Sequence, residues 1–358
     1  MNNTRHIAVV GAGILGASIA YHLAAKGAQV TIVDEGTPAN RATHGSFAWI
    51  NAHNPNDEKY FQFRMASIRL WNELIQTIPK LPVRFGGTLN WEDEPDQIEE
   101  VQRALDDGGN PARLVSQTEI RTIEPNLAQP PEVAIEARAE GVADPTRIAE
   151  AFLFAALSQG ATLRTNAKVL NLTFEQGRVA GVEVPEGIIE ADITVLATGT
   201  ATSDLLAAHD FNLPMDNAPG LLINTAPVPT VTQRVLTSMS LHVCQKDDGS
   251  LLVGEDFGGT NPDEGKTAII ERVQSKLEGY FKGLSEIQVT GSSVAKRPMP
   301  EDGYPALGAV PGFNDLWVAT THSGITLAPI IGESLAAEIL TGKMVKALHP
   351  YRASRFSV

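Results

Sequence analysis

Three glycines near the start of the chain have the spacing of a phosphate-binding turn. Gly11, Gly13 and Gly16 follow an apolar run, 6–10, and begin a small-residue stretch, 17–25, that is typical of a helix. In such a G-x-G-x-x-G turn, the first glycine permits the tight turn and the second lets the backbone approach a pyrophosphate, while the third lets helix and strand pack closely. The helix N-terminus then favours phosphate oxygens. The spacing predicts a dinucleotide site, and a tight turn without a ligand is the alternative.

An acidic pair ends the next apolar run, 29–33. Asp34 stands where the motif requires a carboxylate that accepts hydrogen bonds from ribose hydroxyl groups, and Glu35 follows it. A carboxylate here favours a free ribose 2′-hydroxyl, and therefore FAD or NAD over NADP. The motif alone does not distinguish FAD from NAD.

Length and composition limit the class of protein. The chain has 358 residues, 43% of them apolar, which suffices for two domains with a sizeable core. The net charge of −14 argues against a nucleic acid partner and against an anionic membrane surface. Cys244 is the single cysteine, which excludes an internal disulfide and a cysteine-rich metal site. We expect no metal centre.

The sequence shows neither a membrane-spanning segment nor a signal peptide. No apolar run approaches the roughly 20 residues that a membrane span needs. Residues 1–5 lead directly into the first strand, without the pattern of a signal peptide. We therefore expect a soluble, cytoplasmic protein.

The hydrophobic pattern is of α/β type at both ends of the chain and mainly of β type after residue 220. This order indicates a nucleotide-binding domain that is interrupted by a second domain. The helices are predicted over 57–78, 96–106, 116–123, 146–159, 263–281 and from about 326 to 341. The strands are predicted over 6–10, 29–33, 83–91 (as a pair), 134–140, 161–164, 167–172, 179–184, 188–191, 193–199, 221–225, 234–236, 241–245, 251–255, 287–296 and 316–319.

A long connection, 35–51, stands where a crossover helix is expected. Structureless loops of this length in compact domains are usually functional. The small and hydroxyl residues of 42–51 suit close passage along a bound ligand, with a plain surface loop as the alternative.

Several blocks, in the same order, resemble the FAD-dependent D-amino-acid oxidase-like oxidoreductases, the family of glycine oxidase, sarcosine oxidase and D-amino-acid dehydrogenase. The blocks are the opening unit, 43–51, 143–145 with its helix, 195–199, 297–298 with 302–308, and 322–329. The resemblance covers nearly the whole chain and favours FAD over NAD. It implies an α/β fold in which a Rossmann-type FAD-binding domain (1–80, 141–215 and 300–358) is interleaved with a mixed-sheet α+β substrate domain (81–140 and 216–299).

The resemblance also implies roles for individual residues at the cofactor. Residues 43–46 would lie along the pyrophosphate and toward the flavin ring, Val169 would meet the adenine, and 197–199 would lie near the phosphate and ribose. Residues 324–327 would place backbone N–H groups at the pyrimidine edge of the flavin, where a helix start stabilises negative charge. With the opening motif, the expected cofactor residues are Gly11, Gly13, Ile14, Leu15, Gly16, Asp34, Glu35, Thr43, His44, Gly45, Ser46, Val169, Ala197, Thr198, Gly199, Gly324, Ile325, Thr326 and Leu327.

The substrate side departs from the family pattern. Glycine oxidase-like chains have an arginine before the block at 324 that holds the substrate carboxylate, whereas this chain has the sequence Thr-His-Ser at 321–323. Sarcosine oxidase-like chains have a lysine where this chain has Thr326. The candidates for substrate contact are His322, His242 and Arg297, each with a structural role as its alternative.

Covalent attachment of the flavin is not expected. Cys244 lies outside the block that carries the flavin-linking cysteine of sarcosine oxidases, so noncovalent FAD is predicted. His44 is a remote candidate for a histidyl link.

The resemblance implies oxidation of a C–N bond. Hydride would pass from the substrate carbon to flavin N5, and water would hydrolyse the resulting imine. The partners would be a small amine or an N-substituted or D-amino acid, and oxygen or another electron acceptor. Two alternatives stay open: a noncatalytic or electron-relaying flavoprotein subunit, because the carboxylate-binding arginine is missing, and an NAD-dependent dehydrogenase, from the opening motif alone.

Overall fold

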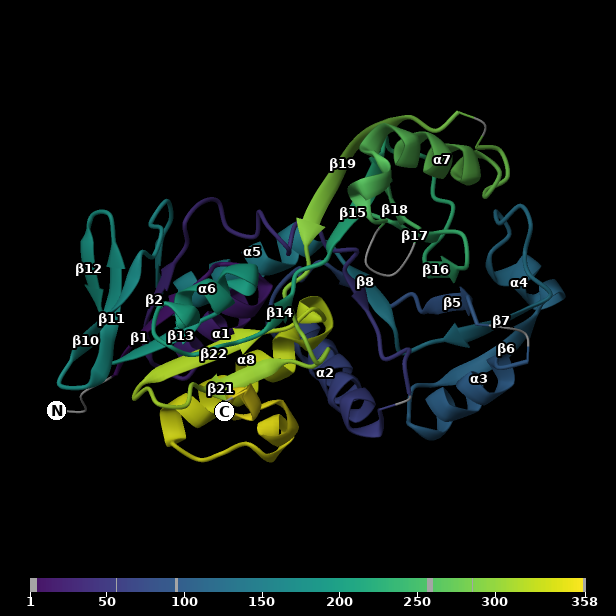
Figure 1. Cartoon of the computed structure of the whole chain (residues 1–358). Helices are drawn as coiled ribbons and strands as arrows, with labels where there is room; N and C mark the ends of the chain where they lie inside the picture. Colours follow the sequence, from purple (N-terminus) through teal and green to yellow (C-terminus); the bar gives the residue numbers. More distant parts are fainter. Residues whose placement is uncertain (1–4, 56, 94–95, 256–259, 285, 357–358) are drawn as a thin grey trace.

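The computed structural model describes residues 5–55, 57–93, 96–255, 260–284 and 286–356. Its elements gather in two parts at opposite ends of the molecule, with helix α2 (Glu58–Thr77) between them (Figure 1). One part contains a mainly parallel six-stranded sheet and the other an eight-stranded sheet, which confirms the predicted α/β fold class with a second, mixed sheet. The predicted domain boundaries stay a prediction, and residues 1–4, on which the absence of a signal peptide was argued, lie outside the described residues.

The six-stranded sheet has the predicted dinucleotide unit at its centre. Its order is β21-β22-β13-β1-β2-β9, with only β21 and β22 antiparallel. Val10 at the end of β1 lies between Val33 of β2 and Leu196 of β13. The carboxyl ends of these strands therefore meet at one edge, where α/β sheets hold ligands. The strands are β1 (His6–Val10), β2 (Gln29–Val33), β9 (Thr162–Arg164), β13 (Ile193–Leu196), β21 (Ala306–Ala309) and β22 (Leu316–Thr320).

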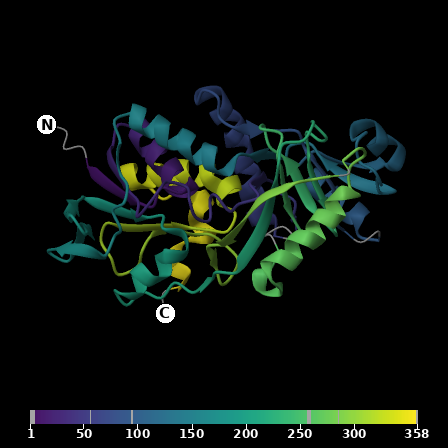
Figure 2. The same cartoon turned by 90° about the horizontal axis from the view of Figure 1, so that it is seen from above.

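The eight-stranded sheet is antiparallel except between β16 and β5. Its order is β19-β15-β18-β17-β16-β5-β7-β6. Ile269, Val273 and Leu277 of helix α7 pack in one hydrophobic cluster with side chains of this sheet. Helices α3 and α4 lie at the same end of the molecule (Figure 2). The strands are β5 (Thr88–Trp91), β6 (Ala112–Ser116), β7 (Val133–Ala137), β15 (Pro219–Thr225), β16 (Val235–Ser238), β17 (His242–Gln245), β18 (Leu251–Gly254) and β19 (Val289–Lys296). The helices are α3 (Ile98–Asp107), α4 (Gln117–Ile123) and α7 (Lys266–Glu278).

Three small sheets complete the strand arrangement. They consist of β3 (Trp49–Ile50), β8 (Gly141–Ala143) and β4 (Val83–Arg84); of β10 (Asn171–Glu175), β11 (Arg178–Val184) and β12 (Gly187–Glu190); and of β14 (Met215–Asp216) with β20 (Met299–Pro300). Short 3-10 helices occur at η1 (Gly199–Ala201), η2 (Pro262–Glu264), η3 (Lys346–Tyr351) and η4 (Ala353–Phe356).

Two strand predictions were wrong in detail. The two strands predicted over 83–91 exist, but they belong to different sheets and do not pair with each other. The strand predicted over 167–172 begins only at Asn171, because residues 167–170 make single backbone hydrogen bonds, from Ala167 to Asp34 and from Leu170 to Glu183, instead of a ladder.

Local capping chemistry explains where three helices begin. The Asp57 side chain accepts a hydrogen bond from the Tyr60 N–H at the start of α2, as predicted. Asp144 caps α5 (Pro145–Ser158) in the same way, with a proline in the first turn. Ser116 and Glu119 form a reciprocal capping box at α4.

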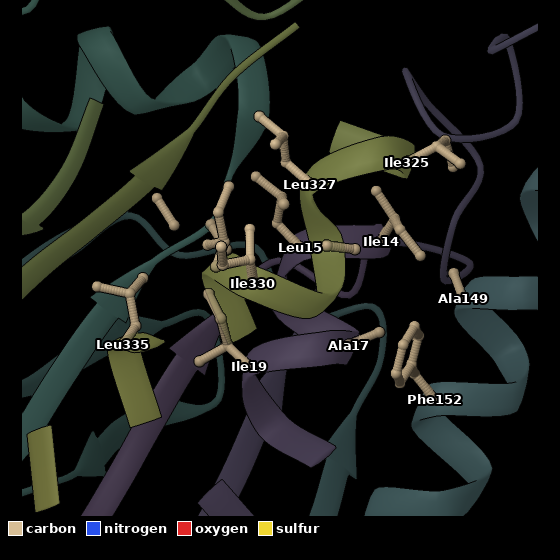
Figure 3. Packing of buried hydrophobic residues seen from close by; sticks show 14 of the residues in the cluster. Ile14, Leu15, Ala17, Ile19, Ala149, Phe152, Ile325, Leu327, Ile330 and Leu335 are labelled. Atoms are coloured by element: carbon tan, nitrogen blue, oxygen red, sulfur yellow. The ribbon is translucent and has the colours of Figure 1, made fainter. Parts of the chain in front are cut away.

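Helices α1 (Ile14–Ala25), α5 and α8 (Gly324–Thr341) pack together in the main hydrophobic core (Figure 3). Ile14, Leu15 and Ile19 of α1 lie against the α8 side chains in this view. α8 is the one described helix that is long and apolar enough to cross a membrane by length and composition, yet 72% of its apolar window is buried inside the protein. This burial is what the central helix of a core requires. The short helix α6 (Thr202–Ala207) follows β13.

A proline inside α8 is compensated by two side chains of α2. Pro329 lacks an N–H group and cannot bond to the Ile325 carbonyl. The Trp71 Nε1–H donates to that carbonyl at 3.2 Å, and Ser67 Oγ donates to the Thr326 carbonyl at 2.6 Å. These contacts fix the first turn of α8 relative to α2.

Candidate functional site

The glycines form the turn that their spacing predicts. Gly11 has φ = 100°, and a Cβ atom there would lie 2.4 Å from the Ala197 carbonyl oxygen. A Cβ atom at Gly16 would lie 1.8 Å from the Gly11 carbonyl oxygen. The strand, turn and helix are therefore so close that a side chain fits at neither position. Thr43 completes the turn, because its Oγ1 accepts a hydrogen bond of 3.1 Å from the Ile14 N–H.

Asp34 is tied to the glycine turn by two backbone donors. Its Oδ2 accepts from the Ala12 N–H at 2.7 Å, and its Oδ1 accepts from the Gly36 N–H at 2.9 Å. Each carboxylate oxygen retains acceptor capacity beyond these bonds. Glu35 forms an exposed ion pair with Arg41 at 2.6 Å. Both acidic residues line the cavity described next, and the contact of Asp34 with a ribose stays a prediction.

A cavity of about 830 Å³, here called the cofactor cavity, extends from the glycine turn to the first turn of α8. This volume lies within the range of roughly 300–1,000 Å³ for ligand sites. The glycine cradle at one helix N-terminus and the start of α8 at the other end fit a long, anionic dinucleotide. The predicted cofactor residues that line it are Gly11, Gly13, Ile14, Leu15, Asp34, Glu35, Thr43, Gly45, Ser46, Val169, Ala197, Thr198, Gly199, Gly324, Ile325 and Thr326.

Three predicted cofactor residues are not among the lining residues. Gly16 faces the Gly11 carbonyl, and its role is to permit close packing. Leu327 is fully buried in the hydrophobic core of Figure 3. His44 is exposed, and its Nδ1 lies 3.1 Å from Thr146 Oγ1.

A second cavity of about 470 Å³ adjoins the first, and we call it the substrate cavity. Trp49, Arg64 and His322 line both cavities. A small molecule held between these side chains would therefore reach both spaces. The remaining lining residues are Asn51, His53, Asn54, Asp57, Tyr60, Glu92, Met299, Asp302, Gly303 and Tyr304.

His322, the first predicted substrate residue, lies at the junction of the two cavities. Burial, together with the smaller effect of the Arg64 and Arg297 charges, lowers the pKa of its imidazole to about 4. The ring is therefore neutral at pH 7. Its Nδ1 is buried without a hydrogen-bond partner among the described residues, so the imidazole can accept or donate a hydrogen bond to a ligand.

The other two predicted substrate residues lie in different places. Arg297 lines the cofactor cavity but not the substrate cavity, and its backbone N–H donates to the Ala218 carbonyl. His242 on β17 is fully buried and lines neither cavity, and its Nε2 lies 2.8 Å from Glu92 Oε1. His242 can act on a ligand only through Glu92, which does line the substrate cavity.

Arg64 was missed by the sequence analysis. It is only 5% exposed, on the face of α2 that also buries Phe61 and Ile68. The sequence spacing could have identified it. An arginine three residues after Phe61 and four before Ile68 falls on the apolar face of a helix. A charged residue at such a position needs a buried partner.

The loop that passes both cavities is held by a buried carboxylate that the sequence analysis also missed. Glu140 is fully buried and accepts hydrogen bonds from Trp49 Nε1, the Ala52 N–H and Asn110 Nδ2, at 3.0–3.1 Å. Three donors compensate the cost of burying this charge. The interaction fixes the 49–52 segment, which supplies Trp49 to both cavities.

Other reactive groups lie outside the cavities. Cys244 is buried in β17, and burial raises the pKa of its thiol to about 12. It is not among the residues that line either cavity. Within the described ranges, no group of three or more His, Cys, Asp or Glu side chains could hold a metal ion.

We expect the free energy of unfolding to fall between pH 6.5 and 4. Burial is the main cause that lowers the pKa of both His22 and His322 from 6.5 to about 4. The unfolded chain therefore binds these protons at a higher pH than the folded chain, so acid favours unfolding in this window. At about pH 4.5, each histidine reduces the stability by about 2 kcal/mol relative to pH 7. Urea unfolding at both pH values should show that the free energy of unfolding of H22Q falls by about 2 kcal/mol less than that of the unmodified protein. Equal decreases in the two proteins would contradict the prediction.

Comparisons with known proteins agree with this architecture. Glycine oxidase of Pseudomonas putida is 26% identical over 355 residues, which cover 95% of each chain. The solved structure of iminodiacetate oxidase from Chelativorans sp. BNC1 is 26% identical, with a TM-score of 0.84 over 97% of this chain and 98% of that one. L-proline dehydrogenase from P. horikoshii, at 22% identity, shares the fold with a TM-score of 0.88 over 99% and 98% of the two chains.

The family match decides between the cofactors that the opening motif left open. Residues 6–338 match the family described as "DAO: FAD dependent oxidoreductase". A match of this extent covers the glycine turn, both cavities and most of α8. The chain therefore belongs to the DAO family of FAD-dependent oxidoreductases.

Proposed function

We propose that this protein uses noncovalently bound FAD to oxidise the C–N bond of an amine or amino acid. The observation that carries the proposal is one continuous site, in which the cofactor cavity meets the substrate cavity at Trp49, Arg64 and His322. The relatives support it, because glycine, iminodiacetate and L-proline, which their names give, are all amino acids with a C–N bond beside a carboxylate.

The residues that would hold FAD follow from the lining of the cofactor cavity. The glycine turn and Thr43 would receive the pyrophosphate, and Asp34 would receive the adenosine ribose. Backbone N–H groups at 324–326 would face the flavin, where the helix dipole favours negative charge. The placement of Cys244 and His44 outside the lining supports noncovalent binding.

FAD, when bound, supplies the hydride acceptor, and the chain must supply binding and proton management. The substrate amine must be neutral before hydride leaves the neighbouring carbon. His322 is neutral at pH 7, since its pKa is lowered to about 4, and it can accept a hydrogen bond that orients the substrate amine. Trp49 and Tyr60 line the space around it.

We propose an enzyme in preference to a noncatalytic or electron-relaying subunit. That alternative depended on the missing arginine before the block at 324. Arg64 supplies a buried cation at the junction of the cavities, so the absence of an arginine near 324 does not remove the capacity to bind a carboxylate. Oxygen or another electron acceptor, and a cytoplasmic location, stay predictions.

The test is anaerobic bleaching of the flavin in the purified protein. The panel should include glycine, sarcosine, D-amino acids, proline derivatives, N-carboxymethyl amines and α-hydroxy acids. We expect a yellow protein whose flavin absorbance is lost with at least one amine or amino acid. A correctly folded, flavin-free protein, or bleaching by α-hydroxy acids alone, would refute the proposal.

A further inference from the structure

A guanidinium group without a counter-ion lies where the two cavities meet. Among the described residues, Arg64 makes one hydrogen bond, from Nη2 to Asn51 Oδ1 at 2.7 Å, and its Nε is buried without a partner. Its Cζ lies 5.5 Å from the Tyr60 ring centroid. No described carboxylate forms an ion pair with it. A buried cation that lacks an anion is costly, so the expected partner is an anion from a ligand.

The position of Arg64 determines which part of a ligand meets the cofactor cavity. Arg64 and His322 line both cavities, and His322 immediately precedes the first turn of α8. A carboxylate bound by Arg64 would therefore leave its neighbouring carbon beside His322, at the inner end of the cofactor cavity. The rest of the molecule would extend into the substrate cavity.

The substrate cavity is acidic apart from Arg64 and its histidines. Two of its three carboxylates already have strong partners. Asp57 accepts from the Tyr304 hydroxyl at 2.5 Å and from a backbone N–H, and Asp302 forms an ion pair with Arg355 at 2.6 Å. The third carboxylate, Glu92, forms no ion pair with an arginine or lysine of the described chain, and its one ion-pair partner is His242.

Glu92 is oriented by a buried histidine and keeps one oxygen free. His242 Nε2 lies 2.8 Å from Glu92 Oε1, while Oε2 makes no hydrogen bond to a described residue. The pKa of His53, which lines the same cavity, shows the effect of the carboxylates around it. Burial lowers the pKa of His53, but Asp93, Glu140 and Glu92 raise it by more, so its pKa lies above the ordinary value.

We propose that Arg64 binds the substrate carboxylate and that Glu92 binds a cationic group at the other end of the substrate. This inference rests on the proposed amine or amino acid oxidation and specifies its substrate class. The substrates are amino acids, or their N-substituted derivatives, that carry one carboxylate and one distal ammonium or guanidinium group. A second carboxylate would lie against Glu92 and is disfavoured by like-charge repulsion.

The test measures ligand binding to the FAD-containing protein, so it does not depend on turnover. Anaerobic titrations, followed by the perturbation of flavin absorbance, compare four ligands. They are 5-aminopentanoate; hexanoate, which has a methyl group in place of the ammonium group; pentanedioate; and hexylamine, which lacks the carboxylate. We expect 5-aminopentanoate to bind about tenfold more tightly than hexanoate, and pentanedioate and hexylamine to bind most weakly.

Two substitutions separate the two contacts. R64M should weaken 5-aminopentanoate and hexanoate alike by about 100-fold, and R64K should restore part of that loss. E92Q should abolish the tenfold preference for 5-aminopentanoate while hexanoate binds as before. E100Q removes one exposed acidic charge on α3 and should change none of these affinities.

The outcomes are distinct from those of the proposed function. Equal binding of 5-aminopentanoate and hexanoate by the unmodified protein, or an unchanged preference in E92Q, would overturn the role of Glu92. Unchanged binding of carboxylates by R64M that retains its FAD would overturn the role of Arg64. If the protein shows the expected ligand preference but no amine bleaches its flavin, the proposed oxidation is refuted and the two proposed contacts remain supported.

Discussion

The G16A variant is expected to lose most of its bound FAD. A Cβ atom at Gly16 would lie 1.8 Å from the Gly11 carbonyl oxygen and 3.4 Å from the Ala197 Cβ atom. Helix α1 must then move away from β1, which displaces the backbone that would face the pyrophosphate. Overpacking of this kind costs about 1–3 kcal/mol. Because the displaced backbone forms part of the cofactor site, we expect FAD to bind about 10- to 100-fold more weakly.

The measurement is the ratio of flavin to protein absorbance after purification, followed by titration of the FAD-depleted protein with FAD. G291A is the matched control, because Gly291 lies on β19 and nothing lies within 4 Å of the Cβ atom that alanine would add there. Circular dichroism should show that both variants keep their secondary structure. A G16A variant that retains FAD as the unmodified protein does would show that the turn tolerates the displacement.

The features that the sequence predicts well are those that depend on near neighbours in the chain. The glycine turn, the Asp57 and Asp144 caps and most helices follow from residues within one or two helical turns of each other. The α/β fold class follows from the hydrophobic period of each segment. The predicted strand at 167–172 was wrong for its first four residues, because the same extended pattern also suits a segment that runs along a cavity.

The substrate side could not be predicted, because its contacts join segments far apart in the sequence. Glu92 and His242 are 150 positions apart, and each lies in a strand region whose neighbour is known only from the sheet order. Arg64 could have been recognised as a buried charge on an apolar helix face. Its place at the junction of the two cavities depends on how α2 packs against the start of α8.

R352M is expected to destabilise the protein by about 3–5 kcal/mol, the cost of removing one partner of a buried ion pair. Glu338, near the end of α8, is 2% exposed. Its Oε2 accepts from Arg352 Nη1 at 2.6 Å, and its Oε1 accepts from Arg352 Nη2 and from the Val345 N–H. The substitution leaves this carboxylate buried without its cation and releases the C-terminal segment from α8.

A second change in the same pair tests this cause. E338Q added to R352M removes the uncompensated charge, so the double variant should recover at least half of the lost stability, whereas independent effects would add. R355M is the control in the same segment, since its ion pair with Asp302 is partly exposed and should contribute at most about 1 kcal/mol. Urea unfolding in excess FAD, followed by circular dichroism, gives the three free energies. If R352M is as stable as R355M, the pair does not hold the C-terminal segment on α8.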